Sequence, residues 1–211
     1  MVFVGAAILP HGGMIFDGDP NSPIPQCRER NSSMPPDVVQ KCSLLYNACE
    51  RAADLVAKMN PDIVLLITPH GLELLSGAYA VYMSNAAQAK MDWIEVNISL
   101  EYKLSEQFLE FVQKQGLKAD GILTFTGSEA PLQWGEGIPL WFLNKKLDSE
   151  KVKYIIVSCG YWGERFEDFG RTLHDFASTL QQRLAVVISA DLAHTHKTDC
   201  TVPLYLPGNY S

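Results

Sequence analysis

Basic residues are scarce in this sequence of 211 residues. It contains 17 Lys and Arg against 24 Asp and Glu, which gives a formal net charge of −7. The basic residues are scattered, and the densest pairing is Lys145 with Lys146. Nucleic acids and anionic membranes are bound through clustered Lys and Arg, so we expect neither as a partner.

The sequence also lacks a long apolar run. No stretch approaches the roughly 18 residues that a transmembrane helix requires. The N-terminal residues MVFVGAAILPHGG are apolar, but no basic segment precedes them, which favours a first strand over a signal peptide. We therefore expect no membrane association.

Cysteines are few and follow no motif. Their number, five, is odd, and no CxxC spacing occurs, which argues against both a disulfide framework and a zinc-finger site. Cys42 and Cys49 lie seven residues apart in a predicted helix, where we expect them to be small buried side chains. A reducing, cytoplasmic location is the default for such cysteine usage.

Apolar strands alternate with amphipathic helices along the chain. The patterns predict strands at 2–9, 62–68, 78–84, 93–98, 122–125, 152–158 and 184–190, and helices at 37–59, 100–115 and 166–183. The segment 10–36 is rich in Gly, Pro, Asn and Ser and is predicted to be a long loop. Together these elements predict a single α/β domain over residues 1–211, with a mostly parallel central sheet flanked by helices.

Four of the five histidines follow predicted strands. His11 follows the first strand in LPHGG, His70 follows the second in ITPHG, and His194 and His196 follow the last in SADLAHTH. In open α/β sheets, ligands bind beyond the carboxyl ends of the strands. His174 instead lies within a predicted helix, where an ordinary surface or core role is expected. The shared placement of the other four predicts a metal-centred active site.

The tripeptide Pro-His-Gly occurs twice, at 10–12 and 69–71. Proline ends the strand and glycine lets the backbone turn sharply, so each imidazole is held at the sheet edge. Neutral imidazole suits Zn, Cu, Fe and Ni, and two histidines with one carboxylate and open positions are typical of non-heme Fe(II) oxygenases. Asp191 could orient a neighbouring imidazole or cap the next turn, and the spacing leaves both interpretations open.

Three segments, PHGG (10–13), TPHG (68–71) and SADLAH (189–194), resemble those of the class III extradiol ring-cleavage dioxygenase superfamily, called LigB-like. The resemblance implies a single LigB-like catalytic domain. It implies His11 and His70 as metal ligands and His194 as acid/base, with His196 or Asp191 in support. The implied cofactor is Fe(II), although zinc would also suit these ligands. The implied partners are an aromatic diol and O2, and the implied reaction opens a catechol-type ring next to the diol.

Two segments depart from the family pattern. The family's third metal ligand usually lies well beyond the late histidine motif, whereas 15 residues follow His196, so we expect that segment to be absent. Glu73, Asp17, Glu136 and His196 are the candidates to complete the site. In addition, QWGEGIPL has Trp134 where many members carry a histidine, and this side chain could stack on an aromatic substrate or simply pack.

Two other functions stay open. The superfamily also includes Memo-type proteins, which are associated with signalling and protein binding, so a non-catalytic or truncated metal- or protein-binding member is the first alternative. The second is a hydrolase in which Cys159, directly after the strand at 152–158, pairs with His194. The glycine pattern of a nucleophile elbow is missing, and a buried thiol is the commoner case. A homo-oligomer is compatible with the sequence.

Overall fold

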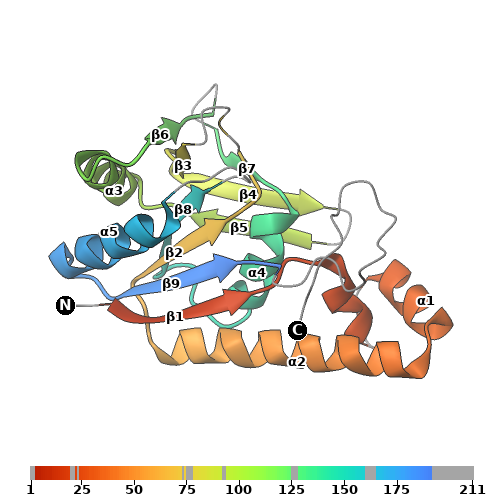
Figure 1. Ribbon diagram of the computed structural model, residues 1–211. Coiled ribbons are helices and arrows are strands. Elements are labelled where there is room, and N and C mark those ends of the chain that lie inside the picture. The colour runs from red at the N-terminus through yellow and green to blue at the C-terminus, as the bar shows by residue number, and fades with distance from the viewer. Residues whose placement is uncertain are drawn as a thin grey trace.

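The computed structural model describes residues 3–19, 22, 24–72, 74, 78–91, 94–124, 128–159 and 165–191. These residues form one α/β unit that contains two sheets (Figure 1). The strands are β1 (Phe3–Leu9), β2 (Ile63–Thr68), β3 (Tyr79–Tyr82), β4 (Ala86–Met91), β5 (Ile94–Ser99), β6 (Ala119–Ile122), β7 (Ala130–Leu132), β8 (Lys153–Ser158) and β9 (Leu184–Ser189). The helices are the 3-10 helix η1 (Gly13–Gly18) and the α-helices α1 (Pro25–Ser33), α2 (Pro36–Lys58), α3 (Tyr102–Lys114), α4 (Trp134–Asn144) and α5 (Phe166–Thr179).

The central sheet is mostly parallel, as the sequence predicts. Its strand order is β1-β9-β2-β8-β3-β6, and β1, β9, β2 and β8 run parallel to one another. β3 pairs antiparallel with β8 and parallel with β6. Because four neighbouring strands run the same way, their carboxyl ends meet at one edge of the sheet, where ligands bind in such folds.

Two hydrophobic clusters cover the two faces of this sheet. One face packs against α3 and α5, through residues such as Phe108 and Phe176. The other face packs against α2 and α4, through residues such as Val56 and Phe142 (Figure 1). The central strands are buried on both faces, which explains their nearly continuous apolar sequences.

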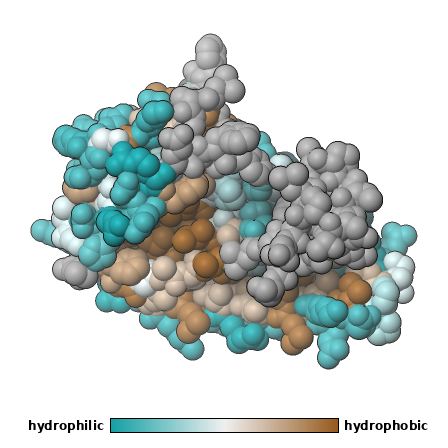
Figure 2. Space-filling model, viewed as in Figure 1, coloured by the Kyte–Doolittle hydropathy of each residue, from teal (hydrophilic) through white to brown (hydrophobic). Residues whose placement is uncertain are grey.

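β1 is an edge strand and is less covered than the centre of the sheet. Phe3 and Ile8 of this strand are exposed, as are Leu44 and Leu55 of α2. Figure 2 shows an apolar surface over this side of the molecule, between α5 and α2. No helix within the described residues is long and apolar enough to cross a membrane.

A second, smaller sheet with the order β5-β4-β7 is absent from the sequence prediction. β4 has the sequence AAQAKM, and Ala, Gln and Lys have little preference for strands. Pairing with β5 over its whole length defines the strand, and its residues Ala87 and Ala89 are buried.

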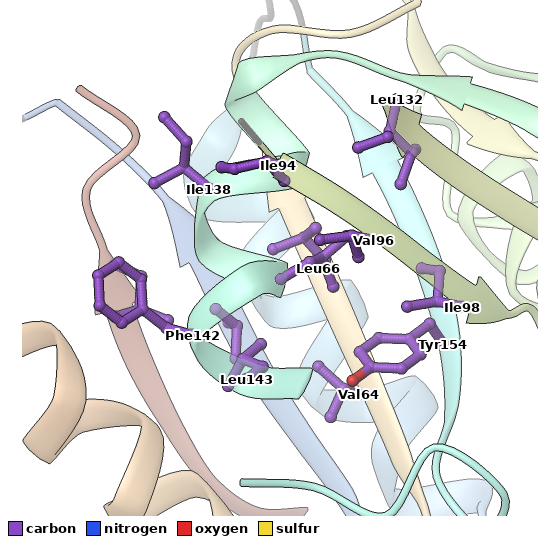
Figure 3. Close-up of a cluster of buried hydrophobic side chains, with 14 of the residues drawn as sticks. Val64, Leu66, Ile94, Val96, Ile98, Leu132, Ile138, Phe142, Leu143 and Tyr154 are labelled. Carbon is purple, nitrogen blue, oxygen red and sulfur yellow. The ribbon is translucent and has the colours of Figure 1, made fainter. Parts of the chain in front are cut away.

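α4 lies between the two sheets (Figure 3). Ile138, Phe142 and Leu143 of this helix pack with Leu66 of β2 and Val96 of β5. The sequence does not predict the helix, because its first six residues, WGEGIP, contain two glycines and a proline. Burial of an apolar helix between two sheets outweighs this weak intrinsic propensity.

The prediction of a long loop at 10–36 is wrong for two stretches. η1 and α1 form there, and Phe16, Ile24 and Cys27 are buried in this segment. Asp17 is fully buried, and both of its carboxylate oxygens accept hydrogen bonds from the Arg30 guanidinium. The α1 sequence PQCRERNSS has no apolar period, so tertiary contacts rather than pattern define this helix.

The remaining predicted elements are confirmed apart from one displacement. The ends of these elements differ from the prediction by a few residues. They are the strands predicted at 2–9, 62–68, 78–84, 93–98, 152–158 and 184–190 and the helices predicted at 37–59, 100–115 and 166–183. The strand predicted at 122–125 is β6, which instead spans Ala119–Ile122. Asp120 and Gly121 are poor strand formers, and they are part of a strand because they pair with β3.

Candidate metal centre

His11 and His70 meet at the carboxyl edge of the central sheet. Each lies two residues beyond the end of its strand, and β9 separates β1 from β2. Their Nε2 atoms are 3.1 Å apart, and the ring planes stand at 87° to each other. His11 is 3% exposed, and His70 is partly buried. Two histidines that are 59 positions apart in the chain thus direct the same ring nitrogen toward a common point.

This separation suits a shared transition-metal ion. Two metal–nitrogen bonds of about 2.1 Å would span 3.1 Å with an angle of about 95° at the ion. That angle is close to the octahedral value and within reach of a tetrahedral one. Imidazole nitrogen is also the donor that iron and zinc accept readily. The two side chains therefore fit the metal that the sequence motifs imply.

Hydrogen bonds hold the turn that carries His70. The backbone N–H of His70 donates to Thr68 Oγ1 over 3.1 Å, and the carbonyl of His70 accepts from Ser158 Oγ over 2.9 Å. The N–H of Leu72 donates to the Tyr82 hydroxyl over 2.9 Å. These bonds fix the backbone on both sides of the imidazole, so its ring has little freedom to leave the site.

Glu136 supports the same turn from α4. Its Oε1 accepts from the Tyr82 hydroxyl over 2.8 Å, and its Oε2 accepts from the Gln133 N–H over 3.1 Å. Gly71 has φ +101, and a Cβ there would lie 2.0 Å from Glu136 Oε1. Burial raises the pKa of Glu136. Burial is also the largest cause that raises the pKa of Tyr82, and the nearby Glu136 carboxylate is the second. Glu136 therefore serves as a buried hydrogen-bond acceptor for the turn.

Ser189 and Gly135 lie behind His11. The Ser189 Oγ is 3.0 Å from His11 Nδ1, and the Ser189 hydroxyl donates to the carbonyl of Gly135. Gly135 also approaches the other histidine closely, since a Cβ at this position would lie 2.6 Å from His70 Cβ. The start of α4 is thus packed directly against His70 and is linked to His11 through Ser189.

Trp134, the first residue of α4, forms an exposed wall of the site. Its ring centroid is 5.1 Å from that of His70, with an angle of 44° between the ring planes. Its side chain is 46% exposed. Of the two roles that the sequence leaves open for Trp134, this exposure favours contact with a ligand over core packing.

Of the other residues predicted to take part in catalysis, the structure describes Asp191. His194, His196 and Glu73 lie outside the described residues. Asp191, two residues after β9, is exposed. Among the described residues no group of three or more His, Cys, Asp and Glu side chains is arranged to hold a metal.

Asp17 and Glu136, the two remaining candidates for a third ligand, have other partners. Asp17 is paired with Arg30, and Glu136 accepts from Tyr82 and Gln133. His174 lies on α5 and is exposed beside Asp175, which agrees with the ordinary role expected for it.

Cys159 has the properties of a structural thiol. It is buried, and its Sγ donates to the carbonyl of Thr68 over 3.3 Å. Burial raises the pKa of this thiol to about 11, so the nucleophilic thiolate is rare at neutral pH. This environment disfavours the hydrolase alternative. Cys42 and Cys49 are buried as expected.

Three hydroxyl residues around the histidines are absent from the predicted site residues, although they share a position in the sequence. Thr68, Ser158 and Ser189 are each the last residue of an apolar strand, in IVLLIT, KYIIVS and LAVVIS. All three are buried, and each makes a hydrogen bond at this edge of the sheet. A buried hydroxyl that ends an apolar strand therefore indicates residues that support the site.

The fold and the site together define a class of protein. It is an α/β protein whose parallel sheet carries, at its carboxyl edge, two facing histidines suited to one transition-metal ion.

The chain matches the family model described as the catalytic LigB subunit of aromatic ring-opening dioxygenase over residues 5–203. Because this match covers most of its length, the chain belongs to that family, as the three histidine motifs predict. At the level of the family, membership supports dioxygenase chemistry on an aromatic substrate with O2, and such dioxygenases are typically metal-dependent.

A curated relative extends beyond this chain. Protein CA_C1420 of Clostridium acetobutylicum is 22% identical over 158 residues, which is 71% of this chain and 34% of that protein. The chain therefore spans about a third of the length of this relative. The relative's name specifies no activity, so the similarity adds neither a substrate nor a reaction.

Proposed function

We propose that this chain is an extradiol dioxygenase that binds Fe(II) through His11 and His70 and opens a catechol-type aromatic ring with O2. One observation carries the proposal: the two Nε2 atoms lie 3.1 Å apart at the carboxyl edge of a parallel sheet. This separation is compatible with a shared metal ion, and family membership supports the aromatic substrate and O2. We also propose that residues 1–211 act as one LigB-like catalytic domain.

Each proposed residue has a distinct task. Bound Fe(II) would supply Lewis acidity toward the two oxygens of the diol and an open position for O2. His194 would accept the phenolic proton, because the pKa of an imidazole lies near neutrality. Asp191 or His196 would support that histidine. Zinc would suit the same nitrogen ligands and would bind without redox activity.

The third ligand is proposed to come from outside the described residues. Asp17 already pairs with Arg30, and moving the Glu136 carboxylate to a metal would leave the buried Tyr82 hydroxyl without its acceptor. Of the four candidates named from the sequence, Glu73 and His196 therefore remain.

Trp134 is proposed to face the substrate. Its exposed ring beside His70 offers an apolar surface on which an aromatic diol can rest while its oxygens reach the metal.

Metal binding is the direct test. After anaerobic reconstitution with Fe(II), we expect about one equivalent of metal in the unmodified protein. His11→Ala and His70→Ala should each lose most of this metal while their circular dichroism stays unchanged, since each removes one of two facing nitrogens. His174→Ala is the matched control, because that histidine is exposed on α5, and it should retain the metal. Stoichiometric metal in both site variants would refute the assignment.

Oxygen uptake then separates the enzyme from a binding protein. The Fe(II)-loaded protein should consume O2 with at least one member of a panel of catechols and release a ring-opened product. Metal binding without O2 uptake across the panel would instead favour the non-catalytic, Memo-type role.

A further inference from the structure

Ser189 stands between His11 and α4. It is the last residue of β9, it is 1% exposed, and its Oγ is 3.0 Å from His11 Nδ1. The same oxygen is hydrogen-bonded to the carbonyl of Gly135, 54 positions away in the chain. One buried hydroxyl therefore joins three separate elements of the fold at the candidate metal centre.

The proton of this hydroxyl has a defined direction. A carbonyl oxygen has no proton, so the single proton of the Ser189 hydroxyl is donated to Gly135. The Ser189 oxygen then acts as acceptor toward His11, and the proton between them belongs to Nδ1. A neutral imidazole that is protonated at Nδ1 has its lone pair at Nε2.

Pro139 explains why the Gly135 carbonyl is available. In an α-helix the carbonyl of Gly135 would accept from the N–H four residues later, and that position is Pro139, which has no N–H. This buried carbonyl would otherwise lack its usual partner within the helix, and the Ser189 hydroxyl supplies one. The proline in WGEGIP thus determines the direction of a hydrogen bond at His11.

We propose that Ser189 is a positioning residue that holds His11 in the tautomer whose Nε2 lone pair faces the metal, with the Gly135 carbonyl fixing the direction of the hydrogen bond. The inference rests on the proposed function for the identity of the site. It adds that His11 is prepared for a metal before the metal arrives, because its Nε2 is already deprotonated and accepts the hydrogen bond from His70 Nε2. Groups that orient a metal-binding histidine through its other ring nitrogen typically contribute about 10- to 100-fold to metal affinity.

The tautomer of the metal-free protein is the first measurement. Long-range ¹H–¹⁵N NMR distinguishes the Nδ1–H and Nε2–H forms of a histidine, and His11→Ala assigns the signal. Above the pH range in which imidazoles titrate, we expect the Nδ1–H form in the unmodified protein. In Ser189→Ala the acceptor is lost, so the signal should shift toward a mixture of both forms. An Nε2–H form in the unmodified protein would overturn the proposal.

Zinc affinity is the second measurement, made by competition with a chromophoric chelator. Ser189→Ala should raise the Kd for Zn(II) by about 10- to 100-fold. Ser189→Thr keeps the hydroxyl and should restore both the Nδ1–H tautomer and most of the affinity. Ser105→Ala is the matched control: Ser105 is equally buried on α3, and its hydroxyl has no hydrogen-bond partner among the described residues. This control should leave the Kd unchanged.

The outcomes separate the inference from the proposed function. If Ser189→Ala binds Zn(II) as tightly as the unmodified protein and keeps the Nδ1–H form, Ser189 has no positioning role. If the unmodified protein binds no metal but His11 shows the Nδ1–H form that Ser189→Ala loses, the metal proposal fails while the hydrogen-bond assignment stands.

Discussion

Among single residues, Trp134 combines an exposed aromatic ring with a position beside the partly buried His70. Trp134 keeps 46% of its surface in contact with solvent although the neighbouring start of α4 is buried. Single exposed apolar side chains are common on protein surfaces, so the position of Trp134 beside His70, rather than its exposure alone, supports the proposed contact with a ligand. A flat ring next to the proposed metal position is the shape that an aromatic diol would stack on.

Trp134→Ala should weaken substrate binding more than it affects the metal. Loss of an aromatic pair costs about 0.5–1.5 kcal/mol, which corresponds to a roughly 2- to 12-fold higher Kd for the diol. An anaerobic titration of the metal-loaded protein with a catechol measures this Kd, and the Kd for the metal should stay the same. Phe3→Ala is the control, because Phe3 is an exposed aromatic residue at the start of β1, at the opposite end of this strand from His11. Equal effects from both substitutions would argue against a contact with substrate.

The sequence reveals the candidate metal-binding histidines but not the residues behind them. His11 and His70 are predictable because each follows an apolar strand, and parallel strands bring such positions to one edge. The role of Ser189 depends on the carbonyl of Gly135, and that contact exists only once α4 is packed between the sheets. The local sequence pattern therefore identifies the two histidines, but it cannot identify Ser189 as their support.

At the scale of elements, the sequence predicts those that have a strong period and misses those defined by their neighbours. α2, α3 and α5 have a clear apolar stripe, and the central strands are continuous apolar blocks. η1, α1, α4 and β4 have weak or contrary propensities, and contacts with distant parts of the chain stabilise them instead. Two of these, η1 and α4, adjoin the site, so the local sequence is least informative where function is expected.

Gly18 tests the packing of η1 against α2. A Cβ at this position would lie 2.2 Å from the backbone of Cys42, and a helix backbone cannot yield as a flexible side chain can. We therefore expect Gly18→Ala to lower the free energy of unfolding by about 1–3 kcal/mol or more, as measured by urea denaturation. Gly13→Ala, in the same 3-10 helix but with open space around its Cβ, should change stability by less than about 0.5 kcal/mol. Similar losses in both variants would contradict the close packing of these two elements.

At the scale of the whole molecule, three buried thiols connect stability to alkaline pH. Cys27 lies on α1, Cys49 on α2 and Cys159 directly after β8. All three belong to the hydrophobic clusters, and burial is the largest cause that raises the pKa of each thiol. Each pKa rises from 9.0 to about 11. Below pH 9 the thiols keep their protons in both the folded and the unfolded chain, so they do not make the free energy of unfolding depend on pH. Between pH 9 and about 11 the unfolded chain releases protons that the folded chain retains, so stability falls as pH rises.

This linkage predicts a steep loss of stability in reducing buffer above pH 9. Each buried thiol contributes up to about 1.4 kcal/mol per pH unit to the slope, because one proton is released on unfolding. Cys49→Ala removes one such thiol, which packs within a hydrophobic cluster, so its slope should be shallower by up to that amount. Urea denaturation across this pH range measures both slopes. Ser105→Ala also truncates a buried side chain but removes no titrating group, so its stability should be offset by a constant and keep the unmodified slope. A Cys49→Ala slope equal to that of Ser105→Ala would mean that this thiol loses its proton as readily in the folded chain as in the unfolded one.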